Sequence, residues 1–213
     1  VKDKNTWIDL ICNIIEKEVI NDKYIIGELK RLKNFHTHTA NHCVRVGVLS
    51  GIIGIYIGMS KKDLTHLIIS GLLHDIGKVQ IPLEILNKPS KLTDFEFDFI
   101  KKHPIYGYER LSKNPSINPI VLDTVLHHHE KLDGTGYPDS LRNLEISIFS
   151  QIVGIADIFD AITSDRPYHD KISIDDAFDV LINNKQKLDK NLIRKVIDCI
   201  SVHINDDIII SYL

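Results

Sequence analysis

Apolar residues recur at spacings of three and four along most of the chain, and few stretches alternate between apolar and polar positions. That period is typical of helices that bury one face. The stripe from Leu64 to Leu72 is an example, and it follows a helix-start signal at Ser60 and Asp63. The pattern predicts helices over about residues 7–32, 37–56, 64–72, 97–102, 119–129, 147–163, 173–183 and 192–204.

Turn-forming residues separate the predicted helices. Gly, Pro, Asn and Ser gather at residues 87–91, 133–143 and 164–171, which are expected to be loops. The pair Asn21 and Asp22 is a candidate break in the first helix. The expected fold class is therefore all-α, with the unusual polar residues near helix ends and in the loops between them.

Composition narrows the classes of function. The 213 residues are 43% apolar, and 26 Lys and Arg against 29 Asp and Glu give a formal charge of −3. This content is enough for a core, and this charge argues against a binder of DNA or RNA polymers. Cys12, Cys43 and Cys199 have no paired spacing, which favours a reducing, cytoplasmic location. No apolar run is long enough for a membrane span.

Eleven histidines are the unusual feature of the composition. His74, Asp75 and Lys78 follow the apolar stripe, at the point where a buried helix is expected to end. Neutral imidazoles and carboxylates are ligands for divalent metals, and a carboxylate can bridge two ions. A lone His-Asp pair at a helix end would equally well complement the helix dipole, so the weight of the metal hypothesis depends on other residues.

Further histidines and acids strengthen that hypothesis. His42 lies on the preceding helix, and His103 opens or kinks a later one. The residues 127–129 are three adjacent imidazoles, which are hard to satisfy in a core without metal or hydrogen-bond partners. Successive helical residues point about 100° apart, so at most two of the three should reach one cluster. Asp157 lies in an apolar stretch with Asp160 three residues on, and a buried carboxylate needs a cation or donors.

Together these residues resemble a known family. His74, Asp75 and Lys78, followed by the run HHEKLDGTGYP at 128–138, are similar to the HD-GYP group of the HD phosphohydrolase superfamily. The long motif and its spacing from the His-Asp pair make chance a poor explanation. The flanking strings at 39–46, 81–86 and 157–168 are similar too, so the resemblance covers about residues 39 to 180.

The resemblance implies an HD-domain helical bundle with a metal centre between helices. It implies that Asp75 bridges two ions, that Lys78 contacts the scissile phosphate, and that Asp160 is an acid behind the metal ligands. The pocket for the nucleotide would include Tyr137 and Arg166. The implied metal ligands are His42, His74, Asp75, His103, His128, His129 and Asp157.

The substrate that the resemblance implies is the bacterial second messenger cyclic di-GMP, cleaved to linear pGpG or to GMP. Iron is the first choice of metal and manganese the second. A water or hydroxide that bridges two metals has a lowered pKa and would attack phosphorus in line. Lys78 would offset the developing charge, and Arg166 would grip a phosphate or a guanine edge through its planar fork.

Some positions depart from the family pattern. His38 stands where some members carry a Glu that is associated with a third metal; it is either a third-metal ligand or a solvent-facing histidine, and two metals are favoured. His169 stands at a substrate-binding position where many members have Lys or Arg, which weakens the positive charge there near neutral pH. Changes at Gln151, Ser140 and Asn143 affect the expected loop geometry, and His127 falls outside the pattern.

Two domain-level expectations and two alternative functions stay open. Residues 1–35 are expected to form an N-terminal helical segment or linker, and 36–213 the HD-GYP domain. The chain begins with Val, so an upstream sensor domain is a candidate partner, as is a second copy in a homodimer. The alternatives to a cyclic di-GMP phosphodiesterase are a catalytically weak sensor or docking module and a phosphodiesterase of cyclic GMP-AMP.

Overall fold

The structure, a computed structural model, describes residues 4–164, 172–184 and 187–203. Within these ranges every regular element is helical, and the only strand-like pairing is an isolated bridge between Asp133 and Arg142. The prediction of an all-α fold is confirmed. None of the helices in these ranges is long and apolar enough to cross a membrane.

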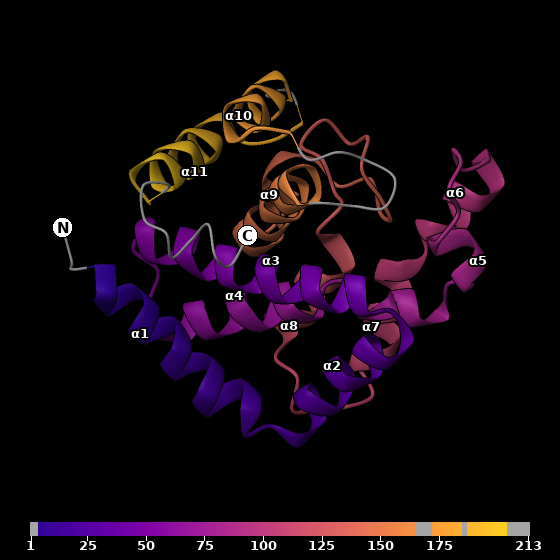
Figure 1. Ribbon diagram of the computed structural model, residues 1–213, viewed down its shortest axis with the longest axis horizontal. Coiled ribbons are helices and arrows are strands. Elements are labelled where there is room, and N and C mark those ends of the chain that lie inside the picture. Colours follow the sequence, from indigo (N-terminus) through magenta and orange to yellow (C-terminus); the bar gives the residue numbers. More distant parts are fainter. Residues whose placement is uncertain (1–3, 165–171, 185–186, 204–213) are drawn as a thin grey trace.

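Eleven α-helices follow one another in this part of the chain (Figure 1). Their bounds are α1 Lys4–Ile14, α2 Lys23–Phe35, α3 Thr37–Tyr56, α4 Lys61–Leu73, α5 Leu83–Leu86, α6 Asp94–Ile100, α7 His103–Leu111, α8 Pro119–His127, α9 Ile148–Thr163, α10 Ile174–Asn183 and α11 Lys190–His203. A π-helical segment covers Ile15–Ile20, and 3₁₀ segments cover Ile76–Gln80 and Asn143–Glu145.

The first predicted helix is divided where the sequence placed a candidate break. The side chain of Asp22 accepts hydrogen bonds from the backbone N–H groups of Tyr24 and Ile25 and so starts α2. The structure differs from the sequence predictions at two other places. The helix predicted over 119–129 ends at His127, two residues early, and the short helix α5 was not predicted.

The long helices α3 and α4 pack side by side at the centre of the fold (Figure 1). Helices α1 and α2 cover them on one side, and α9, α10 and α11 lie on the other. Helices α5 and α6 project at one edge. The bundle thus places the ends of α4 and α8 and the starts of α3 and α7 near its middle, between the two outer layers.

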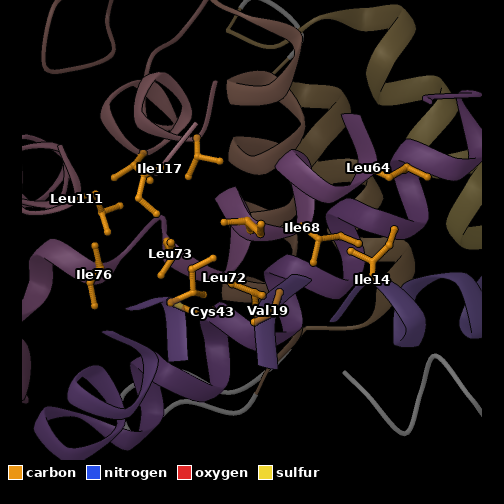
Figure 2. Close-up of a cluster of buried hydrophobic side chains, with 14 of the residues drawn as sticks. Ile14, Val19, Cys43, Leu64, Ile68, Leu72, Leu73, Ile76, Leu111 and Ile117 are labelled. Carbon is orange, nitrogen blue, oxygen red and sulfur yellow. The ribbon is translucent and has the colours of Figure 1, made fainter. Parts of the chain in front are cut away.

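Two groups of buried apolar side chains hold these layers together. One group joins the N-terminal helices to α4 and α8, and Figure 2 shows Ile14 and Val19 beside Ile68, Leu72 and their neighbours. The other group lies between α3, α9, α10 and α11. The buried apolar residues of α1 and of the π-helical segment after it, Ile11, Ile14 and Val19, are therefore part of the core. The proposed division of the chain at residue 35 stays a prediction.

A pair of glycines sets how closely α3 and α4 approach. A Cβ atom on Gly71 of α4 would lie 2.7 Å from the Cα atom and 2.9 Å from the nitrogen of Gly47 on α3. Both neighbours are backbone atoms, which cannot move aside without separating the helices. In contrast, a Cβ atom on Gly27, in the middle of α2, would meet no atom of another element within 4 Å.

We expect Gly71→Ala to lower the free energy of unfolding by about 1–3 kcal/mol, because the added methyl group overpacks the α3–α4 contact. The matched variant Gly27→Ala should raise that free energy by about 0.5–1 kcal/mol, because alanine favours a helix where space is free. Urea unfolding of both variants measures the two values. Equal effects at the two positions would contradict the proposed role of the close contact.

Candidate metal centre

Three buried histidines lie where helices end. His74 follows α4, His128 follows α8, and His103 lies three residues after the end of α6. Each ring donates its Nδ1–H to the carbonyl oxygen three residues earlier: to Gly71 at 2.7 Å, to Ile100 at 2.8 Å and to Val125 at 2.9 Å. These are carbonyls that a helix end leaves without an intrahelical partner. The imidazole satisfies the carbonyl, and its Nε2 atom remains free for another contact.

The free nitrogens of these rings converge on Asp75. The Nε2 atom of His103 lies 3.1 Å from Asp75 Oδ1, and that of His74 lies 3.5 Å from Asp75 Oδ2. The Nε2 atoms of His103 and His128 are 3.3 Å apart. The ring of His129 stacks at a tilt on that of His128, with centroids 4.2 Å apart. The helix ends therefore gather four imidazoles around one carboxylate.

Helices α3 and α9 close the cluster from the other side. His42 on α3 is hydrogen-bonded through Nε2 to Asp157 Oδ1 at 3.0 Å and through Nδ1 to Asp160 Oδ2 at 2.6 Å. Asp157 also lies 3.9 Å from His74 Nε2 and 3.8 Å from His129 Nδ1. Asp160 also accepts two hydrogen bonds from Arg45, at 2.5 and 3.0 Å.

Two sets of ligand atoms within this cluster are close enough to hold a metal ion. One set comes from Asp75, His103, His128 and His129, and the other from His42, His74 and Asp75. In each set the atoms lie within 4.8 Å of one another, and Asp75 belongs to both. The structure thus brings together all seven residues that the sequence selected: His42, His74, Asp75, His103, His128, His129 and Asp157.

The protonation states of these groups favour the binding of a metal cation. Burial and neighbouring imidazoles hold the pKa of His128 well below its usual value, and burial likewise lowers the pKa values of His129 and His74. Burial opposes ionisation of Asp75, but Lys78 and the surrounding histidines outweigh it and hold its pKa well below the usual range. The centre therefore combines an ionised Asp75 with neutral rings at His74, His128 and His129, and neutral imidazoles and carboxylates are ligands that divalent transition metals prefer.

Unpaired atoms in the structure provide a test of this fit. His74 Nε2 is buried and has no hydrogen-bond partner, although burial of a polar atom without a partner is costly. In His103 and His128 the Nδ1–H group donates to a carbonyl oxygen, and the Nε2 atoms of the two rings lie 3.3 Å apart. A divalent cation bound between these nitrogens would accept a lone pair from each. The residues present therefore fit a divalent metal.

Lys78 borders the cluster from the 3₁₀ segment after α4. Its Nζ atom donates to Asp75 Oδ2 at 2.5 Å, and its side chain is 23% exposed. Burial opposes the charge, but Asp75 and Asp157 outweigh it and raise the pKa of Lys78. Lys78 therefore carries a positive charge at neutral pH, and its partly exposed position leaves it accessible to an anionic ligand.

Residues 137–141, which we call the roof segment, follow α8, and the first of them covers one side of the cluster. The ring of Tyr137 lies over that of His129, with centroids 4.8 Å apart and planes 32° apart. Burial, and then the charges of Asp157 and Asp75, raise the pKa of Tyr137 above its usual value. Tyr137 therefore keeps its phenolic proton and can donate a hydrogen bond.

Three other sequence predictions fall outside this geometry. Arg166 and His169 lie outside the described residues. His38 is absent from both sets of metal-ligand atoms found among the described residues, and its ring lies 6.1 Å from that of His36. The third-metal role of His38 stays a prediction.

Sequence reasoning assigned no role to three residues that support the centre. Arg45 holds Asp160, which holds His42. Glu130 is buried and accepts backbone hydrogen bonds from the roof segment. Gly77 touches the start of α7, since a Cβ atom there would lie 1.9 Å from the carbonyl oxygen of His103. The signals were a basic residue three positions after His42, an acid inside the long motif and a glycine between Asp75 and Lys78.

We expect metal binding to release a proton from His42. Burial opposes its protonation, but the hydrogen bonds to Asp157 and Asp160 outweigh burial and raise the pKa of His42 to about 9. The metal-free ring is therefore charged at pH 7, and a metal on Nε2 must displace that proton. Metal affinity should rise with pH between 6 and 8, by up to about tenfold per pH unit.

Isothermal titration in buffers of different ionisation enthalpy measures this release. Asp160→Asn should reduce it, because the variant removes one of the two carboxylates that raise the pKa of His42. Asp98→Asn, on the exposed surface of α6, is the matched control and should change nothing. Metal binding with no net proton release, and with an affinity independent of pH, would contradict the prediction.

Comparison with known proteins agrees with this geometry. Residues 26–192 match the HD domain family. The chain is 40% identical over 154 residues to a cyclic di-GMP phosphodiesterase of Pseudomonas aeruginosa, covering 72% of this chain and 37% of the relative. It is 38% identical over 147 residues to the 3'3'-cGAMP-specific phosphodiesterase 3 of Vibrio cholerae, covering 69% and 32%.

A solved structure shows the same fold. The HDG"Y"P protein Bd1817 of Bdellovibrio bacteriovorus superposes with a TM-score of 0.66 at 20% identity, covering 92% of this chain and 69% of that one. The present chain spans less than half the length of the two curated relatives. By its family match, its relatives and its motifs, the chain belongs to the HD domain family, in the HD-GYP group.

Proposed function

We propose that the chain is a metal-dependent phosphodiesterase that hydrolyses cyclic di-GMP to pGpG, GMP or both. The observation that carries the proposal is the cluster in which Asp75 belongs to two sets of ligand atoms and Lys78 lies beside it. The HD domain is a family of metal-dependent hydrolases. The name of the Pseudomonas aeruginosa relative supports cyclic di-GMP as the substrate.

In this proposal two divalent ions bind the seven clustered residues, with iron preferred over manganese. When bound, such ions lower the pKa of a water and polarise phosphoryl oxygens. Asp75 would contribute a ligand atom to both ions, and the helix-end histidines would bind through their Nε2 atoms, because their Nδ1 atoms are hydrogen-bonded to carbonyls. Asp160 and Arg45 fix the orientation of His42.

The residues around the ions have distinct roles in this proposal. Lys78 offsets the negative charge that develops on the phosphate, because it is cationic and partly exposed at the cluster. Tyr137 binds the nucleotide through a neutral phenol that can donate a hydrogen bond. Arg166 and His169 complete the substrate pocket as proposed from the sequence.

A second candidate substrate is 3'3'-cyclic GMP-AMP. The observation that favours it is the 38% identity to a Vibrio cholerae phosphodiesterase whose name specifies that dinucleotide. The same metal centre would cleave either phosphodiester, so the bases decide between them. The upstream sensor domain, the homodimer and the cytoplasmic location stay predictions.

The experiment that tests the proposal is hydrolysis of cyclic di-GMP and of 3'3'-cyclic GMP-AMP by anaerobically purified protein loaded with iron or manganese. Metal per chain is counted on the same sample. Turnover of cyclic di-GMP with about two metals per chain supports the proposal. Turnover of cyclic GMP-AMP alone replaces the substrate, and full metal loading with tight binding but no turnover replaces the enzyme by a sensor.

We expect the double variant His74→Ala with Asp75→Ala to lose both metal and turnover, because it removes ligands from both sets of atoms. Its helix content should be retained, since most of the buried apolar groups are untouched. Metal analysis, circular dichroism and the hydrolysis assay measure the three properties. Retained turnover in this variant would exclude the metal-dependent mechanism.

We expect Lys78→Met to lower kcat by about 10²–10³-fold while metal per chain stays unchanged, because it removes one charged group that stabilises the transition state. Lys101→Met is a matched control. Lys101 is also three residues after the aspartate that it binds, Asp98, but both lie on the surface. Equal kinetics for the two variants would refute the role of Lys78.

A further inference from the structure

The third of the adjacent histidines does not join the metal cluster. The Nδ1 atom of His127 lies 2.8 Å from Asp123 Oδ1, one turn back on α8, and its Nε2 atom lies 3.0 Å from Asp139 Oδ2. The side chain is only 13% exposed. Both ring nitrogens are therefore engaged by carboxylates outside the cluster, and His127 is not available as a ligand in this arrangement.

Asp139 belongs to the roof segment, residues 137–141. The backbone N–H groups of Asp139 and Leu141 donate to the two carboxylate oxygens of Glu130, at 2.7 and 3.1 Å. Glu130 is 5% exposed. The roof segment is thus tied to the end of α8 twice: by its backbone through Glu130 and by a side chain through His127.

These two ties flank the metal-facing histidines in sequence. His127 precedes His128 and His129, and Glu130 follows them. The backbone N–H of Glu130 also donates to the carbonyl of His127 at 3.0 Å. The segment that they hold begins with Tyr137, whose ring lies over His129. The position of Tyr137 above the cluster therefore depends on how the roof segment is fixed to α8.

We propose that His127 is a positioning residue that pins Asp139 and thereby sets Tyr137 over the metal cluster for nucleotide binding. This inference rests on the proposed function for its substrate, but not for its structural part. Histidine suits the position because both neighbours are carboxylate acceptors, and a ring with two N–H groups can donate to both. Glutamine has one donor group and one acceptor, so it cannot serve both carboxylates.

The size of the effect follows from exposure. Asp123 and Asp139 are 44% and 56% exposed, so each pair is partly screened by solvent. We expect His127→Gln to raise KM for cyclic di-GMP by about two- to fivefold, with kcat and metal per chain unchanged. Asp139→Ala should have the same effect, and the double variant should be no worse than either single variant, because all three lose one shared contact.

Hydrogen exchange gives a readout that does not depend on activity. The backbone amides at positions 139 and 141 should exchange about two- to fivefold faster in His127→Gln and in Asp139→Ala. The matched control His66→Gln, on α4 and away from the roof segment, should leave both exchange and KM unchanged. Because Asp139 is exposed, Asp139→Ala tests the tie even if His127→Gln folds poorly.

The outcomes separate this inference from the proposed function. If no cyclic dinucleotide is hydrolysed but the two amides exchange faster, the substrate is wrong and the positioning role stands. If exchange at residues 139–141 is unchanged in both variants, the positioning role is overturned whatever the activity. Loss of metal from His127→Gln would also overturn it, because His127 would then belong to the metal centre.

Discussion

A hydrogen bond from imidazole Nδ1 to a helix-end carbonyl is the interaction on which the site depends. His74, His103 and His128 all make it, each to the residue three positions earlier. The bond satisfies a carbonyl that the helix leaves unpaired, and it fixes the proton on Nδ1. Nε2 then keeps its lone pair and points inward. The position of each nitrogen is therefore set by where a helix stops.

Packing decides that these helix ends meet. The close contact of Gly47 and Gly71 fixes α4 against α3, which carries His42. The contact of Gly77 with His103 brings the segment after α4 against the start of α7. On the remaining side α9 contributes one acid that faces the cluster and another, one turn on, that supports His42. The two groups of buried apolar side chains hold the helices in this arrangement, and none of their members is a residue of the cluster.

Much of this arrangement could be predicted because its signals are local. Helix starts, the apolar period and the HHEKLDGTGYP motif each occupy a short window of sequence. The expectation that at most two of three adjacent imidazoles reach one cluster follows from helical geometry, and it is confirmed by His128 and His129. The family resemblance supplied the grouping of the more distant residues.

What could not be predicted depends on contacts between distant segments. Arg45 and Asp160 are 115 residues apart, and nothing in the periodicity of either helix indicates their pairing. The early end of α8 follows from the His128 ring, which takes the Val125 carbonyl. Likewise, the contact between His127 and Asp139 depends on how the chain folds back after Tyr137.

The sharing of Asp75 between two sets of atoms has a thermodynamic consequence. An ion in one set draws on the same single carboxylate charge as an ion in the other, so the two occupancies are linked by a coupling free energy and do not fill as independent sites.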